Sequence, residues 1–337
     1  MRQEVLINYF YNKAFRLNQP VSVVIELTTL CNLRCEHCYI PSFTNRGMSF
    51  EQVKKLLLEL RELGVVNVTI TGGEILLRKD LFEIIKFARS LYMRVFLLSN
   101  GTLLTEAIVE KLASLYVSEF STTIFSMNSD IHDSITGSEG SLNHLLKNLN
   151  FFKKTNIQVR VKTPLMKKNL SDFLDVKKYA EEHGFDFAVS PLIFSKSDGN
   201  ETPKELRIKD SELISAIKDI DSITRNNHLT EQEVSCAALF YSFAIDCNGY
   251  VYPCNSFFYK VGNVFEKNVK EIWYESKELN KIKSIKKADL QVCKGCKYSK
   301  HCDRCPALVF MDGLSLNSCD RYSKKLAKIR DSDYTKI

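Results

Sequence analysis

Three cysteines fall within eight residues, as Cys31, Cys35 and Cys38 in a C-x3-C-x2-C run. Thiolates at this spacing suit an iron–sulfur cluster, which normally takes four ligands. With three protein ligands, a [4Fe–4S] cluster keeps one iron open for a cofactor or a substrate. The alternatives are ordinary core cysteines or a zinc site that borrows a distant ligand, because His37 lies inside the run. The spacing favours the cluster.

A second group of cysteines lies near the end of the chain, and none lies in the nearly 200 residues between the two groups. The cytosol disfavours structural disulfides, so such clustering indicates metal binding. Paired C-x2-C spacings strengthen that interpretation, although zinc-ribbon folding competes with iron–sulfur binding and composition does not separate them. The eight cysteines of this group are Cys236, Cys247, Cys254, Cys293, Cys296, Cys302, Cys305 and Cys319.

Length and composition indicate a globular protein with one large α/β domain and a smaller one. Hydrophobic residues make up 45% of the 337 residues, and the net charge is +7. No apolar run reaches the roughly 18 residues of a membrane span. The first 16 residues lack the features of a signal peptide. We therefore expect a cytoplasmic protein with no membrane or nucleic-acid partner.

Short apolar segments alternate with amphipathic helical ones, the pattern of repeated βα units around a parallel sheet. The predicted strands cover residues 21–26, 65–71, 94–98, 119–123, 157–162 and 186–190. The helices between them cover about 49–63, 80–90, 105–114, 141–154 and 171–183. Six units are fewer than the eight of a closed TIM barrel, so the pattern predicts a partial (β/α)6 TIM-type barrel. A doubly wound open sheet is the alternative fold.

Local signals mark the ends of two of these helices. Ser49 and Gln52 form an S-x-x-Q capping box, and Gly64 supplies a left-handed stop. Asp80 is expected to cap the following helix. In either architecture the ligand site lies at the C-terminal ends of the strands.

Polar motifs occur at these strand ends, after the second, third and fourth strands. They are Thr71-Gly72-Gly73-Glu74, Ser99-Asn100-Gly101 and Ser121-Thr122-Thr123. Paired glycines let a backbone approach a ligand closely, although a lone Gly-Gly is more often a simple turn. Convergence of the motifs with a cysteine loop indicates one site.

The three-cysteine run followed by Tyr39, together with the Gly-Gly-Glu of residues 72–74, resembles the signature of the radical S-adenosylmethionine (SAM) superfamily. The resemblance covers roughly residues 21–195, and Ile75 stands where the family often has proline. It implies a [4Fe–4S] cluster on Cys31, Cys35 and Cys38, whose open iron is chelated by S-adenosylmethionine. The resemblance implies that Gly72, Gly73 and Glu74 contact the methionine amino group of the cofactor and that Tyr39 lies near its adenine. Ser99 and Asn100 are further cofactor contacts, at the adjoining strand end. Thr123 is expected near the ribose, with Ser121 or Thr122 as alternatives if the register of the strand differs.

The second cysteine group resembles the SPASM domain, a C-terminal extension that carries auxiliary [4Fe–4S] clusters in peptide-modifying members of the superfamily. The match includes seven cysteines and Gly249, with two residues instead of three between Cys302 and Cys305. The resemblance implies one cluster on Cys293, Cys296, Cys302 and Cys319, and a second on Cys236, Cys254 and Cys305. Cys247 is expected to complete the second cluster, with a buried thiol as the alternative.

The predicted organisation has an extension (1–20), a radical SAM core (21–195), a connector (196–235), a SPASM domain (236–320) and a tail (321–337). The connector combines polar stretches with a helix near 209–225. The lysines between 277 and 287 are interpreted as a solvated helix face, with docking of an acidic partner as the alternative. His132 and Asp133 are assigned no catalytic role.

The resemblance implies an enzyme that modifies a ribosomal precursor peptide by radical chemistry, giving a thioether or C–C crosslink or an epimerised residue. An anaerobic sulfatase-maturing (formylglycine-generating) enzyme is the runner-up, disfavoured because Asn255 replaces that group's aspartate and cannot accept a proton. A non-catalytic zinc-binding scaffold is the alternative of another class. The expected partners are a flavodoxin- or ferredoxin-type electron donor and a separate leader-peptide recognition protein, with direct binding of a short leader as the alternative. About 20 residues before the first strand are too few for a recognition domain.

Overall fold

The fold is built on one nine-stranded sheet with the order β6-β5-β4-β3-β2-β1-β7-β8-β9. It was examined in a computed structural model, which describes residues 2–224 and 236–334. The first six strands are β1 (Ser22–Glu26), β2 (Asn67–Thr71), β3 (Arg94–Leu98), β4 (Glu119–Thr123), β5 (Gln158–Pro164) and β6 (Asp186–Ser190). The last three are β7 (Ser242–Ile245), β8 (Tyr250–Tyr252) and β9 (Gly262–Asn263).

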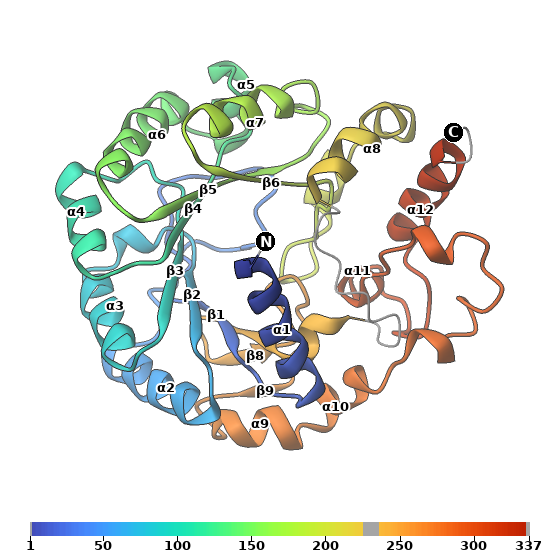
Figure 1. The fold of residues 1–337 in the computed structure, drawn as a ribbon, viewed down its shortest axis with the longest axis horizontal. Coiled ribbons are helices and arrows are strands. Elements are labelled where there is room, and N and C mark those ends of the chain that lie inside the picture. The colour runs from blue at the N-terminus through green and yellow to red at the C-terminus, as the bar shows by residue number, and fades with distance from the viewer. Residues whose placement is uncertain (1, 225–235, 335–337) are drawn as a thin grey trace.

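Strands β1 to β6 are parallel, each paired with the next in the chain, and they curve into the predicted partial barrel (Figure 1). The helices are α1 (Arg2–Arg16), α2 (Phe50–Leu63), α3 (Leu81–Ser90), α4 (Glu106–Ser114), α5 (Ser129–Thr136), α6 (Ser141–Leu149), α7 (Phe173–Glu182), α8 (Asp210–Thr224), α9 (Val269–Glu275), α10 (Lys277–Lys283), α11 (Pro306–Met311) and α12 (Arg321–Tyr334). Helices α2, α3, α4, α6 and α7 cover the outside of the curved sheet. The order of the sheet and this placement confirm the partial barrel.

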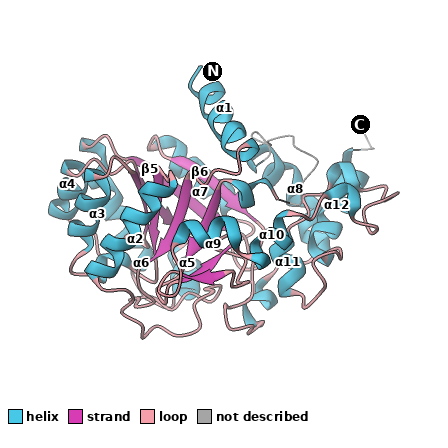
Figure 2. Cartoon of the chain, turned by 90° about the horizontal axis from the view of Figure 1, so that it is seen from below, coloured by secondary structure: helices cyan, strands magenta, loops and turns pink. Residues whose placement is uncertain are grey.

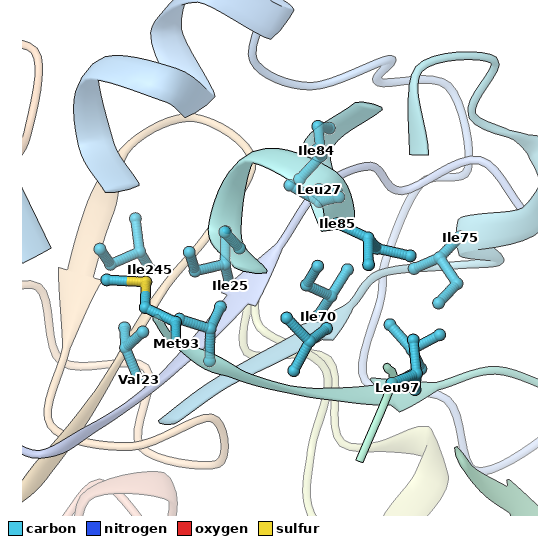
Figure 3. Close-up of a cluster of buried hydrophobic side chains, with 14 of the residues drawn as sticks. Val23, Ile25, Leu27, Ile70, Ile75, Ile84, Ile85, Met93, Leu97 and Ile245 are labelled. Carbon is cyan, nitrogen blue, oxygen red and sulfur yellow. The ribbon is translucent and has the colours of Figure 1, made fainter. Parts of the chain in front are cut away.

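The main core lies between the sheet and its outer helices. Val23 and Ile25 alternate with less buried residues along β1, so one face of the strand packs under helices and the other faces the barrel interior. Ile70 of β2 and Ile84 of α3 complete the same cluster (Figure 3). The six predicted barrel strands match the observed ones to within two residues at each end.

The predicted ends of α2 are confirmed, but the predicted cap of α3 is wrong. Ser49 and Gln52 form the reciprocal capping box, and Gly64 ends α2 with a φ of 99°. Asp80 stands at the N-cap of α3 without a capping hydrogen bond. Its carboxylate instead accepts hydrogen bonds from the Arg78 guanidinium at 2.6 and 2.9 Å. A charged partner two residues away therefore outcompetes the helix terminus.

The cysteine-rich segment extends the same sheet. Strand β7 pairs in parallel with β1, on the side opposite β2, and β8 and β9 continue as antiparallel strands. Sequence reasoning predicted a separate cysteine-rich domain and did not place a strand against β1. The connector helix is confirmed as α8, whereas the end of the expected connector, residues 225–235, lies outside the described residues.

Helix α1 is followed by a turn that the lysine segment contacts through Lys283. Figure 2 shows α1 projecting beyond the strands, with its C-terminal end toward the rest of the chain. The solvated interpretation of the lysine segment is wrong for Lys283, which is 8% exposed. Its Nζ donates to Asn18 Oδ1 at 2.9 Å and lies 3.5 Å from the ring centre of Trp273. Burial lowers the pKa of Lys283 to about 7.

Within the described residues, no helix combines the length and the apolar character that crossing a membrane requires.

Candidate iron–sulfur and cofactor site

The loop after β1 brings Cys31, Cys35 and Cys38 together at the C-terminal ends of the barrel strands. Burial, followed by the neighbouring thiols of Cys38 and Cys31, raises the pKa of Cys35 to about 12. Burial also raises the pKa of Cys38 to about 11, with Cys31 again contributing. Burial is the main reason that the thiolate forms of Cys35 and Cys38 are disfavoured, and repulsion from neighbouring thiolates adds to it. A bound cation relieves that repulsion, because metal ligands must be thiolates.

The paired glycines after β2 hold this cysteine loop in place. Gly73 N–H donates to Thr28 O at 2.8 Å, and Glu74 N–H donates to Leu30 O at 2.7 Å. A Cβ on Gly72 would lie 2.5 Å from Thr28 O, and one on Gly73 would lie 2.2 Å from Leu30 O. Sequence reasoning explained these glycines by close approach of a ligand. The structure shows that the chain's own cysteine loop makes a close approach here.

Glu74 positions the polar turn that follows β3. Its fully buried carboxylate accepts hydrogen bonds from the Ser99 hydroxyl at 2.8 and 2.9 Å and from the Asn100 N–H at 2.8 Å. It also accepts from the Leu76 N–H at 2.8 Å. Burial raises the pKa of Glu74, and these donors act in the opposite direction. The Glu74 side chain is not on the wall of the cavity described next, so its direct contact with a cofactor stays a prediction.

A cavity of about 220 Å³ lies between the cysteine loop and the ends of β2, β3 and β4. Two buried polar atoms of its lining residues, His37 Nδ1 and Thr122 Oγ1, have no hydrogen-bond partner within the described part of the chain. Unpaired buried polar atoms indicate a partner that the protein itself does not supply. The predicted site residues on the wall are Cys35, Cys38, Tyr39, Gly72, Gly73, Ser99, Asn100 and Thr123.

Cys31 stands just behind this wall, where Asn100 Nδ2 lies 3.9 Å from its sulfur. The thiols of Cys31, Cys35 and Cys38 fit a thiolate-held cluster, and the unpaired polar atoms on the cavity wall fit a small polar cofactor beside it. His37 and Lys162, both lining residues, were not predicted as cofactor contacts, and Thr122 was predicted only as an alternative to Thr123. The position of His37 between two of the cysteines was the signal available for it in the sequence.

Tyr39 separates this cavity from a second, smaller one of about 60 Å³. The Tyr39 hydroxyl donates to Glu26 Oε2 at 2.6 Å, and its ring stacks on Phe258 with centroids 5.5 Å apart. Cys254 and Asn255 line the far side of the small cavity. Tyr39 and Thr71 belong to both walls, so the two cavities adjoin. The smaller cavity therefore lies between the cofactor cavity, whose wall includes Cys35 and Cys38, and the cysteine-rich segment, which contributes Cys254.

The cysteines of the C-terminal segment form two further groups. Burial, then the neighbouring thiols of Cys236 and Cys305, raises the pKa of Cys254 to about 12. In the second group, burial and then the Cys319 thiol raise the pKa of Cys302 to about 11, and Cys293 contributes as well. Burial is the largest cause of the raised pKa of Cys319, and the thiols of Cys293 and Cys296 raise that pKa further. The grouping agrees with the two ligand sets that the SPASM resemblance implies.

The structure places Cys247 beside Glu26, and its role as a ligand of the second cluster stays a prediction. The buried Cys247 donates a hydrogen bond to the Glu26 carboxylate, and burial followed by Glu26 and Asp246 raises the pKa of its thiol. Glu26 ends β1 and also accepts a hydrogen bond from Tyr39, so the Cys247 thiol lies at the C-terminal end of β1. Sequence proximity to Cys254 suggested a shared cluster because the path of the β7–β8 turn was unknown.

The thiol groups fit clusters better than single zinc ions. Across residues 2–224 and 236–334, no three His, Cys, Asp or Glu side chains converge closely enough to hold one metal ion. Zinc holds sulfur ligands at about 2.3 Å, so its ligands must converge on a point. An iron–sulfur cluster separates its thiolates because each binds a different iron.

His132 and Asp133 have structural roles, as expected. Asp133 binds the start of α6 through the N–H groups of Gly140 at 2.6 Å and Leu142 at 3.0 Å. His132 is buried, and its Nδ1 accepts from the Phe125 N–H at 3.2 Å. Desolvation lowers the pKa of His132 to about 4.

Family models match both halves of the chain. Residues 25–180 match the radical SAM superfamily, and residues 236–297 match the SPASM iron–sulfur cluster-binding domain. The chain therefore belongs to the radical SAM superfamily and carries a SPASM domain. These domains imply [4Fe–4S] clusters and S-adenosylmethionine as cofactors, and the chain is an enzyme.

Individual relatives are maturases and synthases. The chain is 24% identical to the AdoMet-dependent heme synthase of Methanosarcina barkeri, over 87% of this chain and 93% of that protein. It is 27% identical to the antilisterial bacteriocin subtilosin biosynthesis protein AlbA of Bacillus subtilis, over 91% of this chain and 70% of AlbA. The fold resembles Streptococcus suis SuiB bound to its precursor peptide SuiA, with a TM-score of 0.72 and 19% identity over 96% of this chain and 79% of SuiB.

Proposed function

We propose that this enzyme modifies a ribosomally made precursor peptide, forming a thioether or carbon–carbon crosslink or epimerising a residue. The names of AlbA and of the SuiB–SuiA complex support a peptide substrate. When bound, the reduced cluster and S-adenosylmethionine supply a 5′-deoxyadenosyl radical that abstracts hydrogen from an unactivated C–H bond.

The observation that carries the proposal is that the two cavities adjoin across a shared wall. The cofactor cavity meets the smaller cavity at Tyr39 and Thr71, and Cys254 lies on the wall of the latter. A substrate residue at this junction would lie between the cofactor and an auxiliary cluster. That arrangement suits a reaction in which the substrate radical loses an electron after losing hydrogen.

In this proposal the chain's own residues bind, orient and shield. Cys31, Cys35 and Cys38 hold the first cluster, and Glu74 fixes Ser99 and Asn100 against the cofactor. One auxiliary cluster is held by Cys236, Cys254 and Cys305. The other auxiliary cluster is held by Cys293, Cys296, Cys302 and Cys319. Buried side chains around the cavity exclude water, as radical chemistry requires.

A heme synthase is a second candidate, favoured by the similarity to the Methanosarcina barkeri protein along 93% of that protein. A sulfatase-maturing function is third. The residue after Cys254 on the wall of the small cavity is Asn255, whose amide does not accept a proton at neutral pH. An electron donor of flavodoxin or ferredoxin type and a leader-recognition protein belong to the proposal as partners.

The test incubates reconstituted, chemically reduced enzyme with S-adenosylmethionine and a short peptide encoded beside the enzyme. Loss of two hydrogen atoms from the peptide mass supports crosslinking, and uptake of solvent deuterium without that loss supports epimerisation. A parallel reaction with an iron porphyrin follows heme formation by absorbance. Heme formation with no change in any peptide would overturn the proposal in favour of the second candidate.

A further inference from the structure

A large cavity lies inside the partial barrel, on the other side of the cofactor cavity from the cysteine loop. Its volume is about 860 Å³, within the range of ligand-binding pockets. Its walls come from α1 and from strands β2 to β5. Leu98, Ser121 and Lys162 line both this cavity and the cofactor cavity, so the two adjoin.

The wall formed by α1 is apolar and uncovered. Leu6, Ile7 and Phe10 line the cavity and are 68%, 45% and 40% exposed. The C-terminal half of α1 is anchored instead, because Tyr11 packs on Tyr241 with ring centroids 5.1 Å apart. Phe15 likewise packs on Phe240, with centroids 4.8 Å apart. An anchored helix that holds three large apolar side chains over a cavity is typical of a binding surface.

The wall formed by the strands carries excess positive charge. Arg94, Arg160 and Lys162 line the cavity together with one carboxylate, that of Glu119. The Arg160 guanidinium forms ion pairs with the carboxylates of Glu119 and Asp186, each at 3.1 Å. Arg94 and Lys162 have no ion pair with any residue that the structure describes. The Arg94 guanidinium lies 5.0 Å from the centre of the Phe96 ring, and burial lowers the pKa of Lys162 to about 8, an effect that nearby Glu119 opposes. The cavity therefore offers two basic side chains without an ion pair among the described residues, opposite an apolar helix face.

One polar atom of the wall also lacks a partner. Asn67 is 8% exposed, and its Nδ2 donates to Tyr11 at 3.2 Å and to Ser22 at 3.3 Å. Its Oδ1 is buried without a partner in the described residues. A backbone N–H of a bound chain would satisfy this acceptor.

We propose that this cavity binds a segment of the substrate peptide that carries apolar side chains and a carboxylate. The apolar side chains lie on Leu6, Ile7 and Phe10, and the carboxylate lies near Arg94 or Lys162. The segment then extends past Lys162 into the cofactor cavity. This inference rests on the proposed function, and it names the part of the chain that recognises the peptide.

The first experiment measures binding to reconstituted holoenzyme without catalysis. Two dye-labelled synthetic peptides alternate leucine with glutamate or leucine with lysine, and fluorescence anisotropy gives each Kd. The glutamate peptide is expected to bind at least about ten-fold more tightly. Ile7→Asp and Arg94→Gln are each expected to weaken that binding by about ten-fold. Equal affinity for the two peptides would overturn the inference.

Matched control variants separate this surface from general effects. Asn8→Asp lies on α1 away from the cavity wall, and Lys111→Gln removes a lysine from the exposed surface of α4. Both are expected to bind the glutamate peptide like wild type, and iron content checks the fold of every variant. Analytical sedimentation of wild type and Ile7→Asp measures the oligomeric state, and so tests whether a second copy of this chain occupies the cavity. A change in oligomeric state without a change in peptide affinity would overturn the inference.

The second experiment repeats the assay of the proposed function with the same variants. If wild type modifies the encoded peptide, Ile7→Asp is expected to raise KM about ten-fold, with a smaller change in kcat. Unchanged KM values would overturn this inference and leave the proposed function standing. Absence of any peptide modification by wild type would count against the proposed function, while the anisotropy result would still decide whether the cavity binds an acidic, apolar peptide.

Discussion

Gly73→Ala tests how the cysteine loop is held against β2. The added Cβ would lie 2.2 Å from Leu30 O and 2.6 Å from Thr29 O. Ordinary van der Waals contacts of a Cβ begin at 3.4 Å, so the loop must retreat by about 1 Å. That retreat weakens the 2.7 Å hydrogen bond from Glu74 N–H to Leu30 O and the 2.8 Å bond from Gly73 N–H to Thr28 O.

Each of these buried hydrogen bonds contributes about 1 kcal/mol, and an unsatisfied group costs about 1–3 kcal/mol. The expected loss is therefore about 2–4 kcal/mol at the loop, equivalent to roughly 30-fold to 1000-fold in the cleavage of S-adenosylmethionine. Cluster retention falls as well, because the loop carries three thiol ligands. After anaerobic reconstitution, about four of about twelve irons are expected to be missing.

The assay combines iron and sulfide analysis with the rate of 5′-deoxyadenosine formation. Gly184→Ala is the matched control, because a Cβ there meets nothing within 4 Å and the residue lies beyond α7. Its φ of 69° costs about 1–2 kcal/mol of stability, without any expected effect on iron. Wild-type iron content and cleavage rate in Gly73→Ala would refute this account of the Gly-Gly pair.

Two other predictions concern residues that the sequence interpreted differently. Lys283 has a pKa of about 7 when folded and an ordinary value of 10.5, so the unfolded state binds more protons between these pH values. The free energy of unfolding should therefore rise with pH across that window, by up to about 1.4 kcal/mol per unit, and Lys283→Met should remove the rise. Denaturant midpoints at pH 7 and pH 9 measure this rise in the free energy of unfolding. The same rise in wild type and in Lys283→Met would contradict the prediction. Cys247→Ala should retain wild-type iron because its thiol faces Glu26, whereas Cys254→Ala should lose about four irons. Equal iron loss in both variants would restore Cys247 as a ligand.

The barrel was predictable because its strands have strong local signals. Strand β1 is a mostly apolar run that contains Val23 and Ile25, and the helices begin and end at recognisable residues such as Ser49 and Gly64. Helix α5 was not predicted because Ser129–Thr136 is short and polar, and its start depends on the Asn128 side chain, which accepts from the Asp130 N–H. Short polar helices lack the apolar periodicity on which prediction relies.

Contacts between distant segments were beyond sequence reasoning. Nothing local to Ser242–Ile245 indicates that this strand pairs with β1, and that pairing brings Cys247 to Glu26. Lys283 likewise lies in a lysine-rich helix, and only the tertiary fold puts Asn18 and Trp273 around it. The short C-x2-C spacings indicated metal binding, whereas the division of these thiols into two sets came from the SPASM resemblance, because Cys305 follows Cys302 closely in sequence yet lies near Cys236 and Cys254.

Transfer of deuterium tests the central claim most directly. The peptide encoded beside the enzyme is prepared with deuterium on its carbon atoms and incubated with reduced, reconstituted enzyme and S-adenosylmethionine. Mass spectrometry then measures deuterium in the 5′-deoxyadenosine that forms. Our account predicts deuterated 5′-deoxyadenosine together with a modified peptide. Unlabelled 5′-deoxyadenosine beside an unchanged peptide, when the same enzyme preparation produces heme from an iron porphyrin, would contradict it.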